Sequence, residues 1–93
     1  MSPVKKFKLD NYKEVLKEIE ELGRTDCLRE LEDRVIKEII QLICEGTEEA
    51  KIKLIKLEAL IKEDIGFTPR NKLLVSALRN SIIGALSAAK LCL

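Results

Sequence analysis

The chain has 93 residues, of which 46 % are apolar and 35 % charged, and this length and composition are typical of one folded domain. It contains no His or Trp, one Tyr and two Phe, which predicts an aliphatic core and excludes chemistry that depends on an imidazole. The formal charge of +1 is unevenly distributed: residues 1–9 and 66–93 carry +3 and +4, whereas residues 10–65 carry −6. Each basic end of the chain can therefore meet an acidic partner, or the acidic middle of the same chain.

The three cysteines, Cys27, Cys44 and Cys92, form no CxxC pair, and without His they cannot complete a common zinc site. We therefore expect no metal and no cofactor. The odd count is typical of a reduced, cytoplasmic protein with small buried thiols, and a Cys27–Cys44 disulfide is the alternative. Abundant Ile, Lys and Glu beside a single Gln resemble the composition of proteins from hot environments.

Residues 1–9 are predicted to form an extended arm. Pro3 disfavours a helix at this point, and Val4, Phe7 and Leu9 are interleaved with lysines instead of following a helical period. We expect Phe7 to contact a partner.

Two amphipathic helices follow, over residues 10–22 and 26–45. In the first, Tyr12, Val15, Leu16, Ile19 and Leu22 share one face, and Gly23 is the expected stop. In the second, a wide apolar stripe runs as far as Gly46. The stripe consists of Leu28, Leu31, Val35, Ile39 and Leu42, widened by Ile36, Ile40 and Ile43.

A third helix is predicted from a Thr47 cap to about residue 64, and it is apolar on two opposite faces. One face carries Ala50, Leu54, Leu57 and Ile61. The other carries Ile52, Ile55 and Ala59.

The last helix is predicted over residues 69–91, with Thr68 as its cap and Pro69 in its first turn. Small side chains at Ala77, Ser81, Gly84 and Ala88 form a ridge that another helix can approach closely. Arg79 and Asn80 interrupt the apolar run, which leaves no stretch near the roughly 20 residues that cross a bilayer. We expect no membrane partner.

These elements predict an all-α fold: a compact four-helix bundle over residues 10–93, in which the last helix is central. The two faces of the third helix and the apolar last helix together exceed what four short helices can bury. We therefore expect a partner to cover the stripe of Ile52, Ile55 and Ala59 or the C-terminal half of the last helix. A homodimer that completes its own core is an alternative.

The chain carries no phosphate-binding Gly-rich loop, no nucleophile elbow and no calcium loop, so we expect a protein that is not an enzyme. A small DNA-binding protein of an archaeal virus or plasmid is the alternative function. In that case Arg70, Lys72, Ser76 and Arg79 would form the contact face of a recognition helix.

Over the whole chain, the segments NYKEVLKEIEELGRTDCLRELEDRVIKEIIQLI and FTPRNKLLVSALRNSIIGALSAAKL resemble the small helical accessory subunits of crenarchaeal B-family DNA polymerases. The resemblance implies a subunit that docks on a larger protein within DNA replication and performs no chemistry. It rests on no defining motif, so it assigns no binding residue by position.

Overall fold

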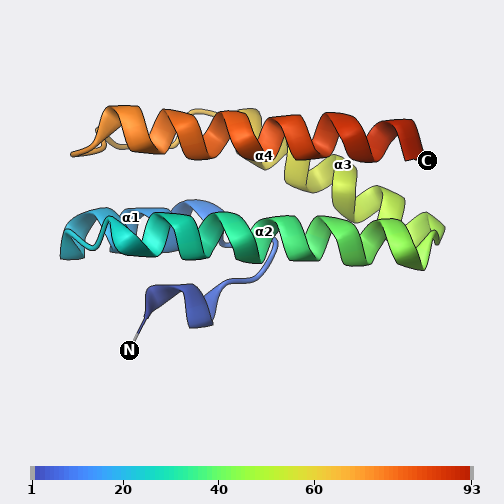
Figure 1. The fold of residues 1–93 in the computed structure, drawn as a ribbon, viewed down its shortest axis with the longest axis horizontal. Coiled ribbons are helices and arrows are strands. Elements are labelled where there is room, and N and C mark those ends of the chain that lie inside the picture. Colours follow the sequence, from blue (N-terminus) through green and yellow to red (C-terminus); the bar gives the residue numbers. More distant parts are fainter. Residues whose placement is uncertain (1, 93) are drawn as a thin grey trace.

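The computed structural model describes residues 2–92 and shows four α-helices after a short 3-10 helix. The elements are η1 (Pro3–Lys6), α1 (Tyr12–Leu22), α2 (Asp26–Glu45), α3 (Glu48–Lys62) and α4 (Lys72–Cys92). The long helices α2 and α4 lie side by side and run in the same direction, while α3 crosses obliquely between their ends (Figure 1). The predicted all-α four-helix bundle is confirmed.

Two glycines end the first two helices where the sequence predicts. Gly23 after α1 and Gly46 after α2 adopt left-handed φ angles of 67° and 61°, a conformation that costs a residue without Cβ little. The Thr47 hydroxyl accepts a hydrogen bond from the Ala50 amide at 3.1 Å and caps α3 as expected.

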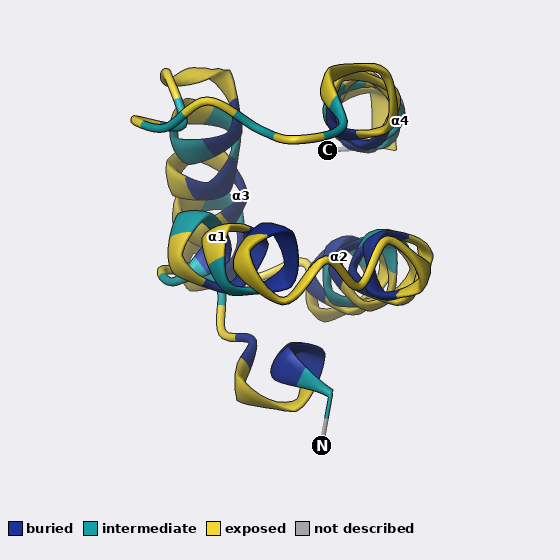
Figure 2. Cartoon of the chain, turned by 90° about the vertical axis from the view of Figure 1, so that its left-hand side faces the viewer, coloured by how far each residue is buried: buried dark blue, intermediate teal, exposed yellow. Residues whose placement is uncertain are grey.

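The most central element is α2, in contrast to our prediction for the last helix. α2 packs against η1, α1, α3 and α4, whereas α4 packs mainly against α2 and α3. One side of α4 is buried, and its opposite side is exposed along its length (Figure 2). None of the helices within residues 2–92 is long and apolar enough to cross a membrane.

The N-terminal residues do not form the extended arm that we predicted. Pro3 supports the first turn of η1, and the Ser2 hydroxyl accepts a hydrogen bond from the Val4 amide at 3.2 Å. Since residues three apart eclipse one another in a 3-10 turn, Val4 and Phe7 point to the same side, into the core formed with α1 and α2. Phe7 is only 4 % exposed, so the prediction that it contacts a partner is wrong for this conformation.

The start of α4 also differs from the prediction, because Asn71 replaces Thr68 as the cap. Its side-chain oxygen accepts a hydrogen bond from the Leu74 amide at 3.2 Å, and the helix begins at Lys72. The Glu20 carboxylate on α1 accepts hydrogen bonds from the Arg70 amide at 2.6 Å and the Asn71 amide at 3.4 Å. Among residues 2–92, Glu20 is the only charged residue that is buried, and its bonds tie α1 to the entry of α4.

All three cysteines are free thiols. Cys27 is buried in the core, as expected for a small apolar side chain, but Cys44 and Cys92 are exposed.

Replacement of Glu20 by Gln is expected to lower the free energy of unfolding by about 1–3 kcal/mol, because the uncharged amide oxygen of Gln accepts weaker hydrogen bonds from the two backbone amides than the buried carboxylate does. Chemical denaturation measures the change. Glu21→Gln is the matched control, since Glu21 is exposed on the same helix and its replacement is expected to change the value by less than about 0.5 kcal/mol. Equal effects of the two variants would contradict the role of Glu20.

The single tyrosine reports on the core through its titration. Burial raises the pKa of the Tyr12 hydroxyl from 10.0 to about 12, and the Arg79 charge opposes this shift. Because the pKa is higher in the folded state, the neutral phenol stabilises the fold below pH 10.0, and this contribution is lost as the pH rises to about 12. Tyrosinate absorbance is expected to follow the higher pKa in the native protein, and Tyr12→Phe is expected to flatten the loss of stability over that pH range.

Candidate interaction surface on α3

The side of α3 that faces away from the bundle carries an exposed aliphatic stripe. Ala50, Leu54, Leu57 and Ile61 point into the core, and helical geometry places Ile52, Ile55 and Ala59 on the opposite side. Ile52 is 50 % exposed and Ile55 is 66 % exposed, and Ala59 is exposed as well. We call these three residues the α3 outer face. The sequence predicts that α3 has more apolar surface than the bundle can bury, and the exposed part is this stripe.

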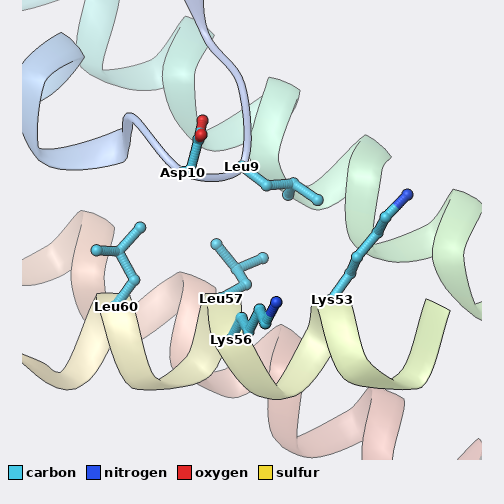
Figure 3. Close-up of a pocket in the computed structure, with 6 residues that line it drawn as sticks. All are labelled: Leu9, Asp10, Lys53, Lys56, Leu57 and Leu60. Carbon is cyan, nitrogen blue, oxygen red and sulfur yellow. The ribbon is translucent and has the colours of Figure 1, made fainter. Parts of the chain in front are cut away.

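A groove lies along one flank of α3, where the chain enters α1. Leu9 approaches Leu57 and Leu60 across this groove, which has a volume of about 390 Å³ (Figure 3). Asp10, Lys53 and Lys56 complete its lining. The groove is thus apolar at its floor, with the charged ends of long side chains at its border.

A second groove, of about 290 Å³, lies along the other flank, between α3 and the C-terminal half of α4. Its apolar lining consists of Leu54, Ile55, Leu86 and Ala89, and its charged lining consists of Lys51, Glu58 and Lys90. Ile55 belongs to both the outer face and this groove, so the two form one continuous apolar surface.

The border of this surface is predominantly basic. Lys51, Lys53, Lys56 and Lys90 line the two grooves, and Lys62 pairs with Glu58 of the second groove; we call these five residues the lysine rim. Lys90 donates a hydrogen bond to Glu58 and holds the pKa of that carboxyl below its usual range, with a smaller contribution from Lys62. Within residues 2–92, Lys53 and Lys56 have no carboxylate within 4.0 Å.

The four residues of the predicted DNA-contact face do not form a single surface. Lys72, Ser76 and Arg79 line one hollow, which they share with Lys62, Glu63 and Asp64, and the two carboxylates there would oppose a phosphate. Arg79 donates a hydrogen bond to the Ile61 carbonyl at 3.3 Å, which ties α4 to the end of α3. Arg70 precedes the helix and lines a separate hollow with Glu20 and Glu21.

The α3 surface offers shape and charge for binding. Within residues 2–92, no three Cys, Asp or Glu side chains are grouped so that they could hold a metal ion. The sequence did not reveal that Leu9, Leu86 and Ala89 line the grooves. These residues reach α3 only through the tertiary packing of α4 and of the segment before α1. The apolar spacing of α4 predicts that Leu86 and Ala89 lie on its inner face, but no comparable pattern in the sequence points to Leu9.

Comparison of the chain with protein-family models, curated proteins and solved structures gave no significant match.

Mutation of the α3 outer face is expected to leave stability intact. Ile55→Ala should change the free energy of unfolding by less than about 0.5 kcal/mol, because Ile55 is largely exposed. Leu57→Ala on the same helix should cost about 2–5 kcal/mol, because it leaves a cavity in the core. Denaturant unfolding of both variants checks the pair. A large loss at Ile55 would mean that the outer face serves the fold and is not reserved for a partner.

Proposed function

We propose that this protein is a non-catalytic accessory subunit that binds a larger protein through the α3 outer face. The segment bound would be an amphipathic helix with one apolar side and acidic residues on its polar side. The observation that carries the proposal is the exposure of Ile52 and Ile55 on a face of α3 that lies between two apolar grooves. Contiguous apolar surface of this kind on a small, highly charged protein is typical of an interaction site.

The shape of the surface supports a helix as the binding partner. The ridge of Ile52, Ile55 and Ala59 is flanked by two apolar grooves that run beside α3. A partner helix that lies along α3 can insert aliphatic side chains into either groove, with anchors spaced three and four residues apart. Ala59 is small, so the partner backbone can approach closely at that end of the stripe.

The charge of the rim supports an acidic partner. Five lysines border the surface. Lys51 is paired with Glu48, and Lys62 and Lys90 are paired with Glu58, whereas Lys53 and Lys56 have no such partner among residues 2–92. Carboxylates on the polar side of a partner helix would meet Lys53 and Lys56 at the edge of the contact. Such rim pairs favour orientation and association rate more than affinity, and they weaken as salt is added.

The sequence resemblance described above makes a replicative B-family DNA polymerase the larger protein that we propose. In this role the subunit would stabilise the holoenzyme by covering an apolar site on the polymerase. Burial of the two isoleucines supplies roughly 1–3 kcal/mol for each side chain, and the remaining affinity would come from the flanking grooves.

A photoreactive residue at position 55 is expected to crosslink to the purified polymerase, whereas the same residue at position 37, on the exposed side of α2, is not. The double variant Ile52→Glu, Ile55→Glu is expected to weaken binding at least about 100-fold, since it would bury two carboxylates against apolar surface and an acidic partner. Titration calorimetry measures this loss, and thermal unfolding verifies that the variant folds.

Two results would contradict the proposal. One is equal crosslinking from positions 37 and 55, which would place the contact elsewhere. The other is an unchanged affinity of the folded double variant. If the polymerase does not bind but a synthetic acidic amphipathic helix binds in a manner that requires Ile55, the docking function stands and the polymerase assignment fails.

A further inference from the structure

One exposed face of α4 carries no charged residue along its length, and the exposed Lys72 and Lys90 lie to one side of it. Residues spaced alternately by four and three positions form this seam, which consists of Leu73, Ala77, Asn80, Gly84, Ser87 and Leu91. Leu73 is 85 % exposed and Leu91 is 90 % exposed, the highest values among the large apolar residues of the described chain. The alternate spacing is the one by which α-helices pack lengthwise against one another. We call this surface the α4 seam.

Gly84, near the middle of the seam, has no reason to be glycine within a single copy. It lies inside a regular helix, where glycine costs about 1 kcal/mol relative to alanine. It does not need a left-handed backbone, and a Cβ added there would meet no described atom within 4 Å. A glycine that is unfavourable for its own helix and is not required by its own packing points to a neighbour outside the chain.

We propose that the α4 seam binds a second copy of this chain, with the two α4 helices antiparallel about a two-fold axis at position 82. In this register Leu73 faces Leu91 of the other copy, Ala77 faces Ser87, and Asn80 faces Gly84. The seam is thus complementary to itself when reversed. The Asn80 side chain fills the space that Gly84 leaves open, whereas a parallel pair would place glycine against glycine and leave a void.

The sizes of the seam residues fit the geometry of two crossing helices. Small residues at the crossing point allow the backbones to approach closely, and the leucines fill the wider gap where the helices diverge toward their ends. Asn80 near the centre gives the interface a polar group, of the kind that fixes register in paired helices.

Charge distinguishes a second copy from a different partner. A two-fold contact sets a surface against itself, so any charge near the axis would meet a like charge. The α4 seam satisfies this constraint because all its residues are uncharged, and the basic residues of the helix, Lys72, Arg79 and Lys90, lie about 100° around the helix from the seam. The α3 outer face does not satisfy it, because its lysine rim would repel its own copy. The two surfaces therefore suit different partners.

The size of the seam sets the strength of the contact. α4 has 21 residues, so its face is about 30 Å long and about 10 Å wide, or roughly 300 Å². Stable complexes bury roughly 800 Å² per partner. We therefore expect a weak, reversible dimer, and one that persists in high salt because no ion pairs hold it.

Sedimentation equilibrium up to about 1 mM protein tests the dimer in a background with Cys44→Ser and Cys92→Ser, which removes the exposed thiols. Gly84→Leu is expected to weaken association at least about 10-fold, because a large side chain would separate the helices. The fold should be retained, since the site is open in one copy. Gln41→Leu on the exposed side of α2 is the matched control and should leave association unchanged.

The register is tested separately in the same background by mixing two variants, Leu73→Cys and Leu91→Cys, under mild oxidation. Crosslinked dimers are expected from the mixture and not from either variant alone, because antiparallel helices bring position 73 to position 91. Crosslinking within each single variant would indicate a parallel pair and overturn the proposal. A strict monomer at 1 mM, or a folded Gly84→Leu variant that associates as the parent does, would also overturn it. None of these outcomes bears on the α3 outer face.

Discussion

The hydrogen bonds from the Arg70 and Asn71 amides to the Glu20 carboxylate fix the position at which α4 begins, and much of the molecule depends on that position. A helix that starts one residue later is rotated by about 100°. If α4 were rotated in this way, Val75, Leu78, Ile82 and Leu86 would leave the core, and charged side chains would approach it. One buried carboxylate on α1 thus helps to fix which side of α4 faces the core and which side forms the seam.

The molecule separates two kinds of exposed apolar surface by their charge. The α3 outer face is bordered by lysines, so the binding that we propose there would combine burial of isoleucine with attraction of carboxylates and would disfavour a second copy. The α4 seam has no charges, so shape decides what it accepts. Two apolar surfaces can in this way coexist on a small chain without competing for the same partner. Charge repulsion would keep a second copy from the α3 outer face, and shape would limit what fits the α4 seam.

The ends of a helix could be predicted from the sequence where neighbouring residues determine them. Gly23, Gly46 and Thr47 act on their own neighbours, and α2 therefore has the predicted bounds of 26–45. The start of α4 was missed because two local signals compete there, Thr68 before Pro69 and the Asn71 cap. The contact that supports Asn71 comes from Glu20, 50 residues before Arg70, and no local pattern reveals it. The fold of residues 3–7 was missed for a related reason: a short 3-10 turn with two apolar residues is stable only against α1 and α2.

The exposed stripe on α3 was predictable, since a helix that is apolar on two sides can bury only one of them. Of the predicted site residues, Phe7 proved to be core, and Arg70 lies apart from Lys72, Ser76 and Arg79 because the helix begins after it.

The α3 outer face and the α4 seam share no residues, although the two helices are neighbours. A pair of chains joined at α4 would consequently be bivalent, with one α3 surface on each side of the axis. Two weak contacts made by such a pair act with a high effective concentration once the first has formed, provided that the target also presents two sites at a matching distance. Avidity of this kind would let a small protein with modest individual affinities discriminate an assembled, multimeric target from its isolated components.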